Sequence, residues 1–249
     1  MDFRQIFSMT KDQLIALDPK DVRFFIPDEG IVHIAKGLDS YWQYDYEAAQ
    51  AGRPGHHAIL KSLNHSDGFF VSKIILQYPN ILEIVAFQLV YRYRYYKYPK
   101  PEWIAGIPDG ATKLGEKVAE LMGVRFAKME KADGKISMTT SIPPFSTLLL
   151  VEDFCTKGTG FKEAVADIKK QNPSVILLPY ELVVLNRGGM SAILVDDIGP
   201  FLIVPSVYYP ITDWDPNGKD GCPLCKMGSI PIKPKATEEN WATITSSQK

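Results

Sequence analysis

The residues best suited to chemistry lie between positions 147 and 160, where two acidic residues and a Thr/Gly-rich loop follow a short apolar run. Leu148–Val151 has the composition of a strand that is buried on both faces. From Phe161 onward, apolar residues return at helical spacing. The loop at 156–160 should therefore join a strand to a helix, where free backbone N–H groups and the helix dipole can bind an anion such as a phosphate.

Glu152 and Asp153 distinguish this loop from an ordinary phosphate site. Ionised carboxylates only accept hydrogen bonds, so they suit the hydroxyls of a sugar better than a phosphate. A ribose 5-phosphate group would satisfy both parts of the motif; the alternative is an acidic turn that caps an ordinary helix. The chain has no P-loop motif and lacks the third glycine of the dinucleotide fingerprint. The residues predicted to hold the phosphate are Thr156, Lys157, Gly158, Thr159 and Gly160.

The stretch from Leu149 to Thr159 resembles the motif with which type I phosphoribosyltransferases bind 5-phosphoribosyl 1-pyrophosphate (PRPP). The resemblance implies that Glu152 and Asp153 hold the ribose hydroxyls, with Asp153 close to the reaction, and that the loop holds the 5-phosphate. It implies an α/β fold with a mainly parallel sheet flanked by helices and covered by an N-terminal hood. It also implies Mg²⁺ as the cofactor, bound mainly through the pyrophosphate and water rather than through a dedicated protein site.

Length and composition set the outer limits of the interpretation. The 249 residues suit one large domain or a core with an appended part. We predict a hood and substrate-recognition region at 1–100, an α/β core at 101–205 and a tail at 206–249.

A net charge of −1 implies no general attraction to nucleic acid or to membranes, so the basic and aromatic segment 91–98 suits a helix end or a subunit contact. Three cysteines and no apolar signal region favour the cytoplasm.

A second strand–loop–helix pattern precedes the first along the chain. Residues 103–107 read as a strand, and a turn with small residues leads into a helical stripe that ends at Gly123. A second anion could bind there, held by backbone amides; the alternative is a plain turn. Type I phosphoribosyltransferases have their pyrophosphate loop at this point, although Gly115 stands where alanine is usual. The candidate residues are Gly110, Thr112 and Lys113.

Residues 58–70 could recognise a planar acidic base. Lys61 supplies charge, and Phe69 or Phe70 supplies a face for stacking. The alternative is a hairpin turn that packs both phenylalanines in the core. The segment is similar to the N-terminal substrate segment of orotate phosphoribosyltransferases, except that Leu63 replaces their usual glycine.

Arg187 follows a predicted strand at 182–185, so it should point into the crevice where α/β sheets bind ligands. Its guanidinium could bind a carboxylate or a pyrimidine carbonyl through two hydrogen bonds. Orotate phosphoribosyltransferases carry a D-R-x-x-G pattern here, whose arginine contacts orotate; this chain has Asn186 in place of the aspartate.

The polar segment 128–146 is long for a loop in a compact domain, and loops of this length usually have a function. Its lysines could close over a pyrophosphate and exclude water; the alternative is a solvated surface hairpin. It resembles the flexible loop with which orotate phosphoribosyltransferases reach into the neighbouring subunit, which implies a homodimer. The candidate catalytic residues in it are Lys128, Lys131 and Lys135.

Cys222 and Cys225 form a C-x-x-C pair in the tail. One such pair is half a zinc site, and we find no second pair or nearby histidine in the sequence to complete it. A zinc ion shared between subunits or a redox pair remains open. His56 and His57 are predicted to be solvent-exposed loop residues.

The sequence thus predicts an orotate phosphoribosyltransferase-like enzyme that binds PRPP and a nucleobase and forms a homodimer. Leu63 and Asn186 leave open the salvage of a different base. A protein that binds PRPP or a nucleotide without catalysis, and regulates a partner, is the alternative from another class. Neither nucleic acid nor a membrane is expected as a partner.

Overall fold

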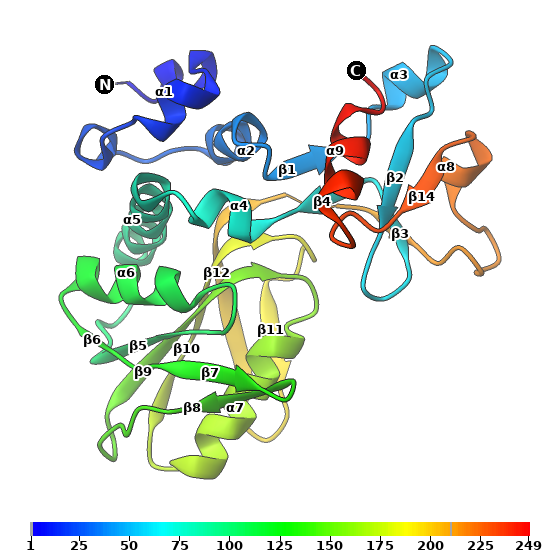
Figure 1. Cartoon of the computed structure of the whole chain (residues 1–249). Coiled ribbons are helices and arrows are strands. Elements are labelled where there is room, and N and C mark those ends of the chain that lie inside the picture. Colours follow the sequence, from blue (N-terminus) through cyan, green and yellow to red (C-terminus); the bar gives the residue numbers. More distant parts are fainter. Residues whose placement is uncertain (1, 210) are drawn as a thin grey trace. The chain divides into compact units, whose positions relative to one another are not determined.

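The computed structural model describes residues 2–209 and 211–249 and forms two compact units (Figure 1). Unit 1 contains Met1–Gly37 and Ser72–Pro210, and unit 2 contains Leu38–Val71 and Ile211–Lys249. Residues 1–100, predicted as one hood, are therefore shared between the units. The tail that we predicted to begin at 206 also contributes to both.

Unit 1 is built on a six-stranded sheet with the order β11-β12-β10-β9-β5-β6. All neighbouring strands are parallel except β11 and β12, which confirms the predicted α/β fold with a mainly parallel sheet. The strands are β5 (Trp103–Gly106), β6 (Arg125–Phe126), β9 (Thr147–Cys155), β10 (Ile176–Asn186), β11 (Ala192–Val195) and β12 (Gly199–Tyr208).

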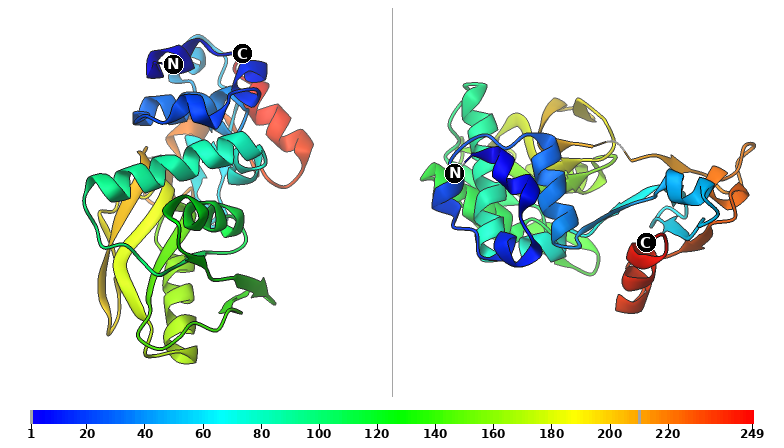
Figure 2. Two further views of the ribbon diagram at one scale, coloured as in Figure 1. Left: turned by 90° about the vertical axis from the view of Figure 1, so that its left-hand side faces the viewer. Right: turned by 90° about the horizontal axis from the view of Figure 1, so that it is seen from above.

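The central strands are apolar on both faces because helices cover both faces of the sheet. All four residues of Leu148–Val151 are buried, as their composition predicts. Helices α5 (Pro79–Tyr95) and α6 (Thr112–Met122) cover one face, and α7 (Thr159–Gln171) packs on the other (Figure 2). Pro79 occupies the first turn of α5, where a missing N–H costs nothing, and separates it from α4 (Ser72–Leu76).

Two strands differ from the sequence prediction. The segments 174–178 and 182–185, predicted as separate strands, belong to the single strand β10, whose pairing with β9 shifts register between Leu177 and Glu181. A bulge of this kind lets a strand continue through a break in its pattern. Strand β12 was not predicted, although its buried and exposed residues alternate from Phe201 to Ile203.

The other elements of unit 1 are short. They are η1 (Phe3–Ser8), α1 (Lys11–Ile15), η2 (Pro19–Val22), α2 (Asp28–Gly37) and the hairpin of β7 (Met129–Ala132) and β8 (Lys135–Met138).

Among the described residues, no helix combines the length and apolar character needed to cross a bilayer.

Unit 2 combines the two chain segments in one small sheet, with the order β13-β3-β2-β14. Strands β2 and β3 come from the first segment, and β13 and β14 come from the second. The core packs Trp42, Tyr44, Leu224 and Ile244 together. The elements are β1 (Tyr41–Gln43), α3 (Tyr46–Gln50), β2 (His56–Ile59), β3 (His65–Ser66), β4 (Gly68–Phe70), β13 (Asp213–Trp214), α8 (Pro223–Lys226), β14 (Ile230–Ile232) and α9 (Glu238–Ser246).

Candidate functional site

Three loops meet at one edge of the unit 1 sheet, because β5, β9 and β10 are parallel neighbours. The backbone N–H of Arg187, after β10, donates to the carbonyl oxygen of Cys155 at 2.9 Å. Gly188 packs so closely on the loop between β9 and α7 that an added Cβ would fall 1.8 Å from the carbonyl oxygen of Thr156. The carboxyl edge of the sheet therefore brings together three of the four segments that the sequence singled out in this unit; the fourth is the polar segment 128–146.

Both helices that begin at this edge start without a side-chain cap. Helix α6 follows Ala111 and α7 follows Gly158, and neither residue caps its helix through a side chain. Gly158 has a φ of +66°, a left-handed conformation that favours glycine. The N–H groups of both first turns are thus oriented toward an incoming anion. The geometry suits two separate phosphate groups on adjacent strands.

Asp153 lies between these two loops. A Cβ added to Gly110 would fall 2.0 Å from Asp153 Oδ2, so the carboxylate rests directly against the backbone of the β5–α6 loop. Asp153 Oδ1 accepts the N–H of Phe154 at 3.0 Å. A sugar that carried one phosphate at each of its two ends would therefore lie beside this carboxylate.

The loop after β5 is shaped by close contact between a strand and a helix. A Cβ on Gly115 would lie 2.5 Å from the backbone nitrogen of Gly106. Glycine rather than alanine at 115 is thus explained by the packing of α6 on β5. Thr112 is half-buried, while Lys113 and Gly110 are exposed at the start of this loop and helix.

Glu152 points away from Asp153 into a buried cluster with Cys155 and Glu181. One carboxylate oxygen of each glutamate and the Cys155 sulfur lie within 4.8 Å of one another. Burial, together with the neighbouring charge of Asp153, raises the pKa of Glu152 to about 7. Burial and the nearby Glu152 raise the pKa of Glu181 well above its ordinary value. Burial also raises the pKa of the Cys155 thiol.

Burial of this cluster favours the neutral form of its carboxyl groups. Among the described residues, no N–H or O–H group donates to Glu152 Oε2 or to either carboxylate oxygen of Glu181. Two adjacent ionised carboxylates would be strongly unfavourable there, so the pair favours a state in which one carboxyl is neutral. Sequence reasoning missed Glu181; the available signal was a single acid in the otherwise apolar half of β10.

Asn186 closes the turn that follows β10. Its Nδ2 donates to the Met190 carbonyl at 2.6 Å, and its Oδ1 accepts the N–H of Gly189 at 3.1 Å. An aspartate could accept here but could not donate, so the asparagine has a structural reason in this chain. Arg187 is half-buried beside this turn.

The segment predicted as a flap forms the β7–β8 hairpin, with a tight turn at Asp133 and Gly134, both at positive φ. The hairpin packs on α7: the N–H groups of Ile136 and Met138 donate to Glu163 and Asp167, each at 2.8 Å. The three candidate lysines of this segment are all exposed. Lys128 pairs with Glu130 at 2.5 Å.

The predicted base-recognition residues of segment 58–70 belong to unit 2. Leu63 has a φ of +70°, so the chain keeps a glycine-like backbone at this position although the side chain differs. Phe70 is buried, and Phe69 packs against Trp241 with ring centroids 6.1 Å apart. Lys61 is exposed. A role for these residues in base binding stays a prediction.

The sequence prediction for the C-x-x-C pair was wrong in one respect. His57 and His65 lie beside Cys222 and Cys225. His57, predicted to be exposed, is fully buried. The reason is that β2 and β3 pair as a hairpin, and β14, just after the cysteines, pairs with β2.

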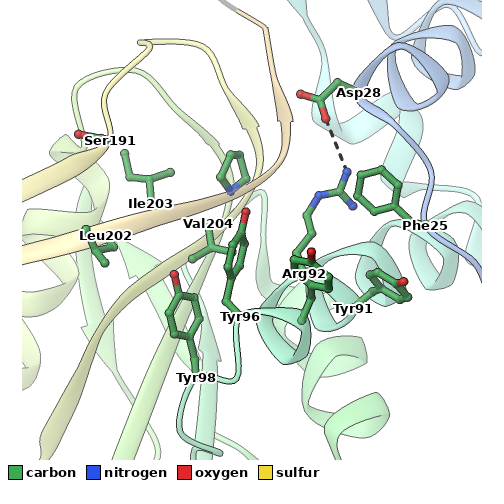
Figure 3. Close-up of a pocket in the computed structure, with 12 residues that line it drawn as sticks. Phe25, Asp28, Tyr91, Arg92, Tyr96, Tyr98, Ser191, Leu202, Ile203 and Val204 are labelled. Atoms are coloured by element: carbon green, nitrogen blue, oxygen red, sulfur yellow. Dashed lines mark ion pairs between the residues drawn. The ribbon is translucent and has the colours of Figure 1, made fainter.

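A separate cavity of about 790 Å³ lies in unit 1 near the end of α5 (Figure 3). None of its lining residues belongs to the predicted site. Arg92 pairs there with Asp28 at 3.6 Å and stacks on Phe25. Tyr95 and Tyr96 are 72% and 58% exposed, which makes this face unusually aromatic. The cavity is lined by Phe25, Asp28, Tyr91, Arg92, Tyr95, Tyr96, Tyr98, Ser191, Leu202, Ile203, Val204 and Pro205.

Comparison with curated proteins finds clear relatives. The chain is 30% identical over 181 residues to orotate phosphoribosyltransferase of Caldanaerobacter subterraneus, which covers 72% of this chain and 87% of the relative. It is 28% identical over 196 residues to the orotate phosphoribosyltransferase of Wolinella succinogenes, covering 76% and 93%. No family model matches the chain.

Solved structures show the same fold. Orotate phosphoribosyltransferase from Aeropyrum pernix aligns with a TM-score of 0.52 at 13% identity, over 70% of this chain and 90% of that one. UMP synthase of Leishmania donovani aligns with a TM-score of 0.51 at 17% identity, over 87% of this chain and 43% of that one.

Proposed function

This chain belongs to the orotate phosphoribosyltransferase family, and from that premise we propose that it transfers the 5-phosphoribosyl group of PRPP to orotate, releasing pyrophosphate. One observation carries the proposal: two uncapped helix N-termini on adjacent parallel strands, with the Asp153 carboxylate between them. This arrangement matches a ligand with a phosphate at one end, a diphosphate at the other and a sugar in the middle.

The loop 156–160 and the first turn of α7 would hold the 5-phosphate, and Gly110, Thr112 and Lys113 would hold the pyrophosphate. Asp153 would accept a ribose hydroxyl and stabilise the positive charge that develops on the sugar as the bond to pyrophosphate breaks. Glu152 is also proposed to hold a ribose hydroxyl, supported by the family resemblance of the motif, and its carboxylate lies against Gly160 at the start of α7. The protein thus mainly positions the reactants.

Mg²⁺ fits this site through oxygen ligands. Asp153 supplies a carboxylate beside the pyrophosphate loop, while the Glu152–Cys155–Glu181 cluster does not suit Mg²⁺ because it contains a protonated thiol. When bound with PRPP, Mg²⁺ would neutralise charge on the pyrophosphate.

Arg187 would select the base. Orotate carries a carboxylate beside its ring carbonyls, and a guanidinium can bind such a pair through two hydrogen bonds. Arg187 follows β10 directly and is tied by its backbone to the phosphate loop. From unit 2, Lys61, Phe69 and Phe70 are proposed to contribute to base recognition, supported by the resemblance of their segment to the family pattern and by the glycine-like backbone of Leu63.

The test of the function is pyrophosphate release from PRPP and Mg²⁺, with orotate and then a panel of other bases. We expect release to depend on orotate and to fall at least tenfold in Arg187→Ala, the loss of about 1.4 kcal/mol or more of binding. Arg125→Ala is the matched control, because Arg125 stacks on Trp103 at the opposite end of β5. Release with another base alone would keep the reaction and overturn the choice of orotate.

A prediction about Gly110 tests the placement of Asp153. In Gly110→Ala the new Cβ would collide with the Asp153 carboxylate, so we expect the Kd for PRPP to rise about tenfold, measured by calorimetry. Gly218→Ala serves as the control, since Gly218 belongs to unit 2 and its added Cβ would be crowded only mildly, at 3.3 Å from the Asp215 carbonyl oxygen. An unchanged Kd in Gly110→Ala would contradict the site geometry.

For the catalytic role, we propose that Lys128, Lys131 or Lys135 on the β7–β8 hairpin closes on the pyrophosphate. Lysine-to-alanine variants in the same assay identify which of them does so.

One observation on the same hairpin favours a second candidate function. The hairpin is held on α7 by Glu163 and Asp167. A protein with a fixed hairpin could bind PRPP and regulate a partner without turnover. Tight PRPP binding with no release for any base would establish this alternative.

We also propose a homodimer in the cytoplasm. The aromatic face around Tyr91, Tyr95 and Tyr96 offers apolar surface for a subunit contact. Light scattering that gives the mass of a single chain at micromolar concentration would contradict the dimer.

A further inference from the structure

Four potential metal ligands converge in unit 2. His57 lies on β2 and His65 on β3, while Cys222 directly precedes α8 and Cys225 lies within it. Their ligand atoms all lie within 4.8 Å of one another. His57, His65 and Cys222 are 0%, 8% and 4% exposed, while Cys225 faces solvent. Buried polar side chains from two distant segments have thus been placed around one point.

The distances match those expected around a tetrahedral zinc ion. With Zn–N bonds of about 2.0 Å and Zn–S bonds of about 2.3 Å, tetrahedral ligands are separated by about 3.3 Å for N–N and about 3.5 Å for N–S. His57 Nε2 lies 3.0 Å from His65 Nδ1. Cys222 Sγ and Cys225 Sγ lie 3.6 and 3.5 Å from His57 Nε2, and Cys225 Sγ lies 3.4 Å from His65 Nδ1.

Hydrogen bonds around the cluster also orient the imidazole ring of His57. His57 Nδ1 lies 2.9 Å from Ser229 Oγ, and that hydroxyl donates to the Gly55 carbonyl at 3.3 Å. These two hydrogen bonds fix the tautomer of His57 in which Nδ1 carries the proton and Nε2 presents its lone pair to the other ligands, as is usual for metal-binding histidines. The cysteines sit on a short turn, where the N–H of Lys226 donates to the Cys222 carbonyl.

We infer that His57, His65, Cys222 and Cys225 form a structural Zn²⁺ site that joins the two chain segments of unit 2. Two thiolates and two imidazoles suit Zn²⁺ and exclude Mg²⁺ and Ca²⁺, which bind oxygen ligands. Four protein ligands fill the tetrahedron and leave no open position for substrate, so the site is structural rather than catalytic. The inference does not depend on the proposed function.

The test begins with the metal content of the full chain, purified without chelator, by mass spectrometry. We expect about one zinc per chain in the wild type and less than a tenth of that in Cys225→Ser and His57→Gln. Two matched controls lie close by. His56→Gln changes the neighbouring residue of the same strand, and Cys155→Ser changes the third cysteine, which belongs to unit 1. Both controls should keep the zinc.

A second measurement needs no variant. Wild-type chain stripped with a chelator and titrated with Co²⁺ should show the intense visible bands of tetrahedral cobalt and a thiolate charge-transfer band, saturating at one ion per chain. A wild type without stoichiometric zinc, and with only the weak spectrum of octahedral cobalt, would overturn the inference. Loss of zinc in Cys155→Ser but not in Cys225→Ser would overturn it as well, because the metal would then belong to the cluster of Glu152, Cys155 and Glu181.

Discussion

Replacing Asp153 with asparagine is expected to lower kcat/KM for PRPP by roughly 10- to 150-fold. The change keeps the shape of the side chain and the acceptor for the Phe154 N–H, but removes the negative charge beside the sugar. A hydrogen bond to a charged group contributes about 1.5–3 kcal/mol, and here it should be strongest when positive charge develops on the ribose. Initial-rate measurements of pyrophosphate release test the effect.

The control for this experiment is Asp12→Asn, which removes an exposed aspartate from α1, outside the three loops. It should keep the wild-type rate. If Asp153→Asn retained kcat/KM within about twofold, the carboxylate between the two loops would have no part in the reaction. The reading of this edge as a PRPP site would then be wrong.

The variant Glu181→Gln should remove a large pH dependence of stability. In the folded chain, burial raises the pKa of Glu181 well above 4.5 and that of Glu152 to about 7, while in the unfolded chain both ionise near 4.5. Between the unfolded and folded pKa values, the folded state binds more protons than the unfolded state, and Glu181 accounts for up to one of them. The stabilisation is therefore complete below about pH 4.5 and is lost as the pH rises toward 7, by about 1.4 kcal/mol per pH unit for one proton.

Glutamine imitates the neutral carboxyl in shape and lack of charge, so its side chain should be accommodated without loss of folding. Urea unfolding at pH 5, 6 and 7 should show a slope of ΔG against pH that is smaller than the wild-type slope by about 1.4 kcal/mol per unit. The control Glu120→Gln lies on the exposed face of α6 and should keep the wild-type slope. Equal slopes for Glu181→Gln and the wild type would show that the pair holds no extra proton.

The phosphate loop and its strand could be predicted from sequence because their signals are local. A strand buried on both faces must be apolar throughout, and an amphipathic helix repeats its apolar residues every three to four positions. Leu148–Val151 and the residues after Phe161 satisfy both rules within 20 positions. Leu63 shows the limit of such reasoning, because its residue type indicated a changed turn while its backbone kept the left-handed conformation.

The cluster in unit 2 had a local signal only in its C-x-x-C pair, Cys222 and Cys225. Its histidines and cysteines are about 160 positions apart, and the pairings of β14 with β2 and of β13 with β3 bring them together. One clue was available: neighbouring residues on a strand point to opposite faces, so only one of His56 and His57 can face outward. Glu181 was missed for a similar reason, since its partner Glu152 lies on a neighbouring strand.

The discontinuous course of the chain through unit 2 has a consequence for synthesis on the ribosome. Hairpin β2–β3 emerges early, but β13 and β14, its partners on either side, are translated only after unit 1. About 160 residues separate His65 from Cys225, which at about 5–20 residues per second is roughly 8–32 s. During that interval the nascent hairpin has two open edges, so the synthesis of residues 211–249 decides when this part of the protein becomes protected.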